Sequence, residues 1–193
     1  INTNNADYKE YIKRAKATSN ICTAQALLAV LAGFYAIHHG PEGMKKIAEE
    51  VHQKALWIDK ELENLVVVQE DTCYFDTLCI RFDSIELCEK IKEAFEAKRI
   101  FLYSLSPTSL GLSVDETHDI NDLQYFINTL SVALGSSYVS QNKQQCSFCK
   151  IPKDLLRQSP ILKSEVFSRY SSETQLMRYI KKLESKDLSL THS

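Results

Sequence analysis

The sequence is poor in the residues that build the commonest phosphate-binding sites. It holds only 5 glycines and 4 prolines, and neither a G-x-G-x-x-G nor a G-x-x-x-x-G-K pattern occurs in it. Both patterns wrap glycine-rich backbone around phosphate groups, so the classes of site that depend on them are excluded. An excess of positive charge is missing too, because 23 basic residues face 25 acidic ones and the net charge is −2. The overall charge therefore does not favour nucleic acid or an anionic lipid surface as a partner.

What is present is the composition of a globular protein. Hydrophobic residues make up 44% of the chain and charged residues 25%, values that argue against disorder and multi-span membrane proteins. With 193 residues we expect one domain, or one domain and a fragment of a second. Six cysteines could form three disulfides, but a chain of this size needs none, so we predict a reducing compartment. Because the first residue is Ile1 and not Met, we expect a processed or excised chain.

Residues 21–37 form a nearly continuous apolar run that follows a basic cluster. This arrangement imitates a signal peptide or a membrane span. The imitation is imperfect, because Thr23 and Gln25 interrupt the run and alanine supplies much of its length. We therefore predict a buried helix rich in small residues. Gly40 and Pro41 should end this helix and begin the next one.

The next helix has a clear amphipathic pattern. Lys45, Glu49, Lys54 and Glu61 are expected to face water. The apolar residues recur in steps of three and four, as expected for one buried face: Met44, Ile47, Ala48, Val51, Ala55, Ile58 and Leu62.

Short strands and helices alternate through the middle of the chain. Asp83 and Glu86 resemble a helix N-cap and its reciprocal acid, and a further helix should start at Asp119 and end near Leu134. Strands are predicted at residues 65–68, 77–82, 100–105 and 110–114. This order predicts an α+β fold with helices packed on a small, mostly antiparallel sheet.

The chain should be divided by a polar linker. We predict a domain over residues 1–135, a linker over 136–150 and a different unit over 151–193. That last unit is expected to be extended as far as Arg169 and then helical over 172–186. A lone helix needs a partner surface, so the tail should be mobile, or dock on the first domain, on a domain outside this chain or on a second copy.

Three sets of residues are candidates for a chemical role, but each lacks the partners or the structural context that this role needs. Cys146 and Cys149 have the spacing of a redox dithiol or half a zinc site, but the two further ligands and the strand-to-helix context are missing. His38 and His39 are adjacent, so they point to different sides of a helix and complete no metal site. Cys22 stands at an expected helix start, where a thiolate would be stabilised, but no histidine is assigned to it. The residues alone thus predict an α+β domain with an extension.

In several stretches the identity of the residues is more informative than the hydrophobic pattern. They are Lys16-Ala-Thr-Ser-Asn-Ile-Cys-Thr-Ala-Gln-Ala-Leu-Leu-Ala29, His39-Gly-Pro-Glu-Gly43, Tyr74-Phe-Asp-Thr77, Leu110-Gly-Leu-Ser-Val-Asp-Glu-Thr117 and the tail from Ser159-Pro160 through Ser172-Glu-Thr174 to Lys186-Asp-Leu-Ser-Leu-Thr-His-Ser193. Together they resemble the glycine cleavage system P-protein family, the pyridoxal-phosphate-dependent glycine dehydrogenases (decarboxylating). The resemblance covers roughly residue 12 to the end.

The resemblance implies a large enzyme of two related halves, each with the fold type I (aminotransferase-like) architecture. Residues 1–135 would be the small C-terminal domain of the first half, and residues 151–193 an extended and helical tail that starts the second, cofactor-carrying half. The family's aldimine lysine lies in a His-Lys-Thr segment, and this chain has no His-Lys pair. The fragment should therefore be a scaffold that binds no pyridoxal phosphate and is inactive alone.

For the complete enzyme the resemblance implies decarboxylation of glycine and transfer of the aminomethyl group to lipoyl H-protein. Its partners would be the remaining P-protein halves, in a dimer or heterotetramer. Its compartment would be the cytoplasm in a bacterium or the mitochondrial matrix in a eukaryote. We expect no catalytic, metal, membrane or nucleic-acid-binding residues in this chain.

The same resemblance suggests which residues lie nearest the shared active site. The interface or active-site-adjacent candidates are Thr18, Ser19, Asn20, Ser172, Glu173, His192 and Ser193. Ser171 stands where the family usually has a histidine, which leaves the role of that imidazole open. The alternatives are a stand-alone, non-catalytic α+β interaction or ligand-binding module and, more weakly, a dithiol protein that uses Cys146 and Cys149.

Overall fold

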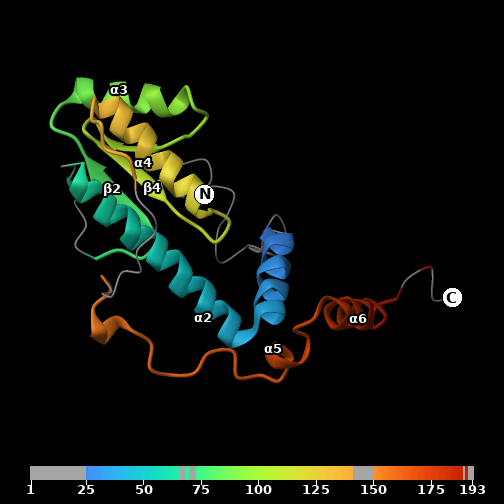
Figure 1. Cartoon of the computed structure of the whole chain (residues 1–193). Coiled ribbons are helices and arrows are strands. Elements are labelled where there is room, and N and C mark those ends of the chain that lie inside the picture. Colours follow the sequence, from blue (N-terminus) through green and yellow to red (C-terminus); the bar gives the residue numbers. More distant parts are fainter. Residues whose placement is uncertain (1–24, 66–67, 70–72, 141–149, 189, 191–193) are drawn as a thin grey trace, which may run out of the picture. The chain divides into compact units, whose positions relative to one another are not determined.

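The computed structural model describes residues 25–65, 68–69, 73–140, 150–188 and 190, and Figure 1 labels most of their helices and two of their strands. The chain divides into two compact units. The first comprises Ile1–Gly40 and Leu162–Ser193, and the second comprises Pro41–Ile161. The predicted division at residues 136–150 concerns the halves of a larger protein and stays a prediction.

The long helix α2 (Ala26–Asn64) is two helices separated at Gly40. Gly40 has φ 63° and ψ −177°, a backbone conformation that is essentially restricted to glycine. Pro41 then supplies a preset φ for the first turn of the next helix. The prediction that Gly40 and Pro41 end one helix and begin another is confirmed. We call residues 26–39 the first arm and residues 41–64 the second arm.

The first arm is helical as predicted, but the prediction that it is buried is wrong. Leu27 and Leu28 are each 67% exposed, and every side chain from residue 25 to 33 is exposed. The reason is that the described part of the first unit contributes none of the buried apolar side chains of the molecule. Among the described residues, no helix combines the length and the apolar character needed to cross a membrane.

The second unit is built on a four-stranded antiparallel sheet with the strand order β1-β2-β4-β3. Its strands are β1 (Val68–Gln69), β2 (Thr77–Arg81), β3 (Tyr103–Ser106) and β4 (Ser109–Ser113). Ile80 pairs with Leu110, so these two buried side chains share the inner face of the sheet. The predicted α+β class is confirmed. All four strands differ from their predicted bounds. β2 and β4 differ by one residue, whereas β1 and β3 start three residues later than predicted, because Leu65 lies in the turn after α2 and the third strand begins only at Tyr103.

The core lies where the inner face of this sheet meets the second arm, α3 (Ile85–Glu96) and α4 (Ile120–Leu134). Full burial of one large apolar side chain contributes roughly 1.5–3 kcal/mol. The largest fully buried apolar side chains come from all four groups of elements: Trp57, Leu56, Ile58, Leu62, Leu78, Ile80, Ile91, Phe95, Leu110, Ile127 and Leu130. The predicted buried stripe of the second arm is confirmed from Val51 to Leu62.

Two predictions about polar residues of this unit are wrong. Lys54 and Glu61 are buried, because Lys54 donates to the carbonyl oxygens of Asp115 and Glu116 and Glu61 accepts from Tyr138. The N-cap of α3 is Ser84, one residue after the predicted Asp83, because the Ser84 hydroxyl accepts from the main-chain N–H of Leu87. The predicted start of α4 at Asp119 is confirmed, and its capping box is complete.

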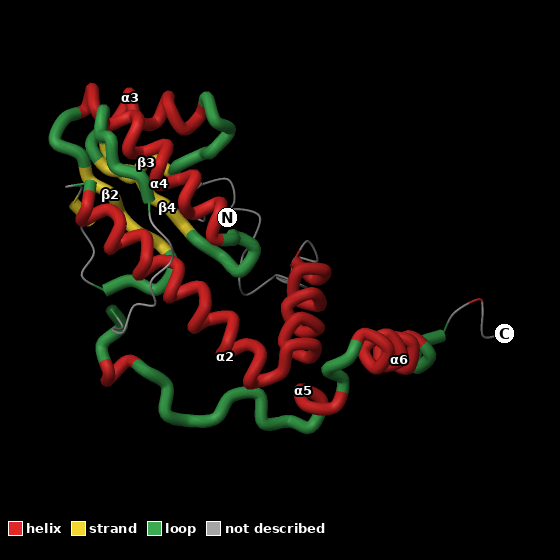
Figure 2. The backbone as a smooth tube through the Cα atoms, in the orientation of Figure 1, coloured by secondary structure: helices red, strands yellow, loops and turns green. Residues whose placement is uncertain are grey.

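The C-terminal part of the chain is mostly loop between three short helices, as Figure 2 shows. These are η2 (Lys153–Leu155), α5 (Val166–Arg169) and α6 (Glu173–Glu184). The predicted final helix is therefore present, and only two short helical turns interrupt the predicted extended stretch before it.

Candidate functional site

Two segments that are distant in sequence pack together in the first unit. At Gly40 an added Cβ atom would lie 2.8 Å from the main-chain oxygen of Phe167 in α5, so the two backbones approach as closely as glycine permits. Gly40 belongs to the His39–Gly43 stretch, and Phe167 belongs to the tail. The structure thus brings together two of the sequence stretches that resemble the family.

Aromatic rings make a second contact between the same segments. The Tyr179 ring of α6 stacks on Tyr170, with ring centroids 4.2 Å apart and an angle of 15° between the planes. The same Tyr179 ring meets the Phe34 ring edge to face at 6.3 Å. Aromatic pairs of these kinds contribute about 0.5–1.5 kcal/mol beyond the burial of their area. The tail helix is therefore held on the first arm.

Two of the predicted site residues lie at the start of α6. The Ser172 hydroxyl accepts from the main-chain N–H of Gln175 and caps the helix, and Glu173 is the first helical residue. An acid in the first turn is stabilised by the partial positive charge at a helix N-terminus. Both side chains are exposed and could meet a further surface. Thr18, Ser19, Asn20, His192 and Ser193 lie outside the described residues, as do Cys22, Cys146 and Cys149.

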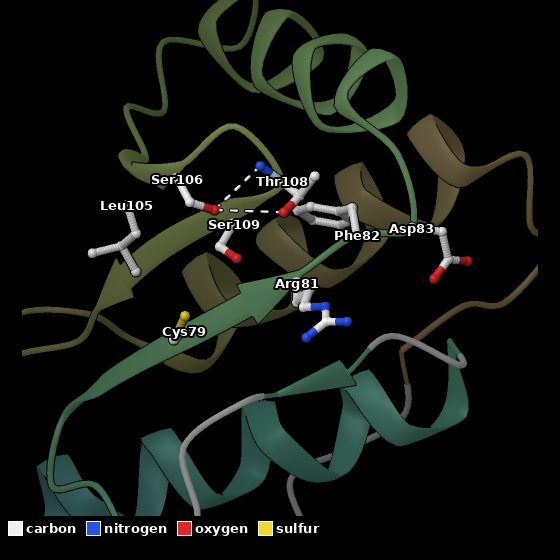
Figure 3. A pocket seen from close by; sticks show the side chains of 8 residues that line it. All are labelled: Cys79, Arg81, Phe82, Asp83, Leu105, Ser106, Thr108 and Ser109. Carbon is white, nitrogen blue, oxygen red and sulfur yellow. Dashed lines mark hydrogen bonds between the residues drawn. The ribbon is translucent and has the colours of Figure 1, made fainter.

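A separate shallow hollow lies in the second unit, around the ends of β2 and β4 and the turn before β4 (Figure 3). The Ser106 hydroxyl accepts from the Thr108 N–H at 3.2 Å, which fixes that turn. One guanidinium and several hydroxyls in the lining are groups that can hold an anion. The lining contains neither histidine nor lysine, so it offers no amine or imidazole for catalysis: Cys79, Arg81, Phe82, Asp83, Leu105, Ser106, Thr108 and Ser109.

A polar cluster that sequence analysis missed lies between the second arm, the segment before β2 and residue 150. The Tyr74 hydroxyl donates to the buried Asp59 carboxylate at 2.6 Å, and Lys150 pairs with the same carboxylate oxygen at 3.2 Å. His52 donates from Nδ1 to the Phe75 carbonyl oxygen. The available signal was an aspartate directly after the four apolar residues 55–58. These contacts tie residue 150 to the second unit and give the Asp59 carboxylate two partners, which indicates a structural role.

The described thiols and metal-binding groups do not form a reactive centre. Burial is the main cause that raises the pKa of the Cys88 thiol, so this residue stays protonated and is a poor nucleophile. Within the described ranges, no group of three or more His, Cys, Asp or Glu side chains is arranged to hold a metal ion.

Comparison with known proteins identifies relatives of this chain. The family model for the glycine cleavage system P-protein matches residues 8–130. A glycine dehydrogenase (decarboxylating) of Flavobacterium johnsoniae is 43% identical over 185 residues, and that of Bacteroides thetaiotaomicron is 41% identical over 185 residues. The corresponding protein of a Nostoc species is 44% identical over 191 residues. Each match covers 96% of this chain, and the chain spans 19% of the length of each relative.

Proposed function

Because the chain belongs to the glycine cleavage system P-protein family, we propose that it is a structural segment of a glycine dehydrogenase (decarboxylating) and carries none of the covalent chemistry itself. The substrate of the complete enzyme is then glycine, and the acceptor of its aminomethyl group is the lipoyl H-protein. The relatives named above are bacterial. We expect the enzyme in the cytoplasm if its source is a bacterium, and in the mitochondrial matrix if its source is a eukaryote.

Pyridoxal phosphate supplies the electron sink for such a decarboxylation when it is bound through a lysine. The described residues do not fit a complete site for it. The amine of the buried Lys54 is already engaged with two carbonyl oxygens, whereas imine formation needs a free amine. The lining of the hollow in Figure 3 contains no lysine. We therefore assign cofactor binding to other parts of the enzyme.

The observation that carries this proposal is the packing of the tail on the first arm. Under the proposed role, residues 26–40 belong to the last domain of the first half of the enzyme, and residues 162–188 belong to the start of the second half. The close approach of Gly40 to Phe167 and the ring contact of Phe34 with Tyr179 support a joint between the halves. We further propose that the second unit is the small domain of a fold type I half.

We propose a position at this joint for the predicted candidates. Ser172 and Glu173 start α6 directly after Tyr170, whose ring lies on Tyr179. We propose that they face the active-site region of the complete enzyme, together with Thr18, Ser19, Asn20, His192 and Ser193. Their role would be to shape the joint and not to react with substrate.

A chimera tests the proposed function. Residues 1–193 replace the aligned stretch of the Flavobacterium johnsoniae enzyme, and exchange of the carboxyl group of glycine with labelled bicarbonate is measured in the presence of H-protein. We expect the chimera to keep exchange activity within roughly tenfold of the parent, a difference of about 1.4 kcal/mol. The chain alone should show no exchange and no borohydride-reducible pyridoxal phosphate adduct at one specific lysine.

Two results would contradict the proposal. Exchange by the 193-residue chain alone would show that it contains the chemistry. A folded chimera without activity, together with saturable ligand binding by the chain alone, would favour the stand-alone module instead.

A further inference from the structure

The first arm exposes more apolar surface than a free surface helix carries. We call residues 26–37 the apolar arm. Its exposed large side chains are Leu27 at 67%, Leu28 at 67%, Val30 at 52% and Leu31 at 54%. No charged residue occurs between Ala26 and Pro41. A surface helix normally has one polar face, and a helix that is apolar on all sides is normally buried.

The described part of the tail leaves much of this arm uncovered. It contacts the first arm at Phe34 and at Gly40, whereas residues 25–33 are exposed. The tail helix is mostly polar, and Met177 on it is itself 60% exposed. In the described part of the first unit, Gly40 is the one buried residue. The described part of this unit therefore contains no hydrophobic core that would offset the entropy of ordering it.

We propose that the apolar arm is an internal docking helix, covered by the parts of a P-protein that lie outside this chain. This inference rests on the proposed function and names the partner surface. The relatives are about five times as long as this chain, since it spans 19% of each, and the arm lies within the residues that match the family model. The occupant must be an uncharged apolar surface, because a charge against this arm would lose its hydration without gaining a partner.

The composition of the arm supports a close approach of that surface. Ala26, Ala29, Ala32 and Gly33 alternate with the leucines, so a second helix or sheet could approach the backbone between the larger side chains. The four large exposed side chains alone would contribute roughly 1.5–3 kcal/mol each when fully buried. That gain would order a unit that the isolated chain holds by few contacts.

Cysteine labelling tests the docking. Leu28→Cys is placed in the 193-residue chain and in the chimeric full-length enzyme, and its reaction with a maleimide is followed by mass spectrometry of the peptide, which separates it from the native cysteines. We expect the rate in the full-length enzyme to be at least about tenfold lower, as for a group that reacts only after local opening. Lys46→Cys is the matched control, because Lys46 is 78% exposed on the second arm and should react quickly in both proteins.

The possible results are separable. Equal labelling of Leu28→Cys in both proteins would overturn the docking proposal. Protection in the isolated chain, together with a dimer mass in light scattering, would assign the arm to a second copy and also overturn it. An inactive chimera with a protected arm would refute the proposed function and leave the docking intact. If the chimera does not fold, the cysteine is placed at the aligned position of the Flavobacterium johnsoniae enzyme, and the same comparison applies.

Discussion

Gly40 is the residue on which the packing of the first unit depends most. Its φ of 63° costs a residue with a Cβ atom about 1–3 kcal/mol, and the added methyl group would also meet the Phe167 oxygen at 2.8 Å. We expect Gly40→Ala to release α5 and α6 from the first arm. Limited proteolysis between residues 162 and 188 should be roughly tenfold faster, as a loss of about 1.4 kcal/mol implies.

Gly33 provides the matched control for that substitution. It lies in the first arm, and a Cβ atom there meets nothing within 4 Å. Gly33→Ala should therefore stabilise the helix by about 1 kcal/mol and slow or leave unchanged the same proteolysis. Equal acceleration by both alanines would show that the close approach at Gly40 does not hold the tail.

Tyr138 connects the segment after α4 to the second arm. Its hydroxyl donates to the Glu61 carboxylate at 3.0 Å and accepts from Asn64 at 3.1 Å. We expect Tyr138→Phe to lower the free energy of unfolding by about 1 kcal/mol in urea denaturation at neutral pH. Burial first, and then the bond to Glu61, raise the pKa of Tyr138 above 10.0.

The sign of this shift gives the prediction a pH dependence. Because the folded pKa is the higher one, the stabilisation by Tyr138 is complete below the unfolded value near 10 and is lost as the pH rises through the folded pKa. The difference between the wild type and Tyr138→Phe should shrink in strongly alkaline solution. A difference that stays constant or grows there would contradict the assignment.

At the scale of the element, α4 depends on its cap. The Asp119 carboxylate accepts from the main-chain N–H groups of Asn121 and Asp122 at 2.7 and 3.0 Å, and the bond from Asp122 is the main cause that lowers the pKa of Asp119. Because the folded pKa is the lower one, this stabilisation is present above the unfolded value and is lost as the pH falls through the folded value.

Asp119→Ala should therefore lower the thermal midpoint at neutral pH, and its difference from the wild type should disappear in acid. Asp119→Asn keeps an accepting oxygen at the N-cap and should retain most of the stability, without the pH dependence. Thermal scans from neutral pH down to about pH 2 measure both effects. A variant Asp119→Asn as unstable as Asp119→Ala would contradict the capping argument.

Most elements were predictable because neighbouring residues encode them. One wrong strand boundary also has a local cause, whereas one wrong burial prediction has a distant cause. The cap at Asp119 and the break at Gly40 are encoded by neighbouring residues. The strand expected from Ile100 starts later because Arg99 adopts φ 62° and the Ile100 N–H bonds back to Phe95, which keeps residues 99–100 at the end of α3. Burial of Lys54 was not predictable, because its acceptors at Asp115 and Glu116 are distant in sequence.

At the scale of the whole molecule, the candidate site could be predicted only in part. The cap at Ser172 follows from the sequence, whereas the meeting of Gly40 with Phe167 is a long-range contact that periodicity cannot encode. The exposure of the first arm was missed for a related reason. An apolar pattern predicts that a helix is covered, but it does not say whether its cover lies in the same chain.

The uneven distribution of buried side chains predicts that the two units differ strongly in stability. All buried apolar side chains of the described residues belong to the second unit. The helices of the first unit are short, and isolated helices of such lengths are marginal in water. In hydrogen–deuterium exchange of the 193-residue chain, α3, α4 and β2 should exchange at least about tenfold more slowly than residues 26–39 and α6.

A shortened chain of residues 41–161 checks the same prediction from the other side. It retains the whole buried core, so its cooperative thermal transition should fall within about 5 °C of the midpoint of the full chain, a shift that corresponds to roughly 1 kcal/mol. Slow exchange throughout residues 26–39, or loss of the transition in the shortened chain, would mean that the first unit stabilises the second. The full-length enzyme should instead protect both units, because there the apolar arm has its cover.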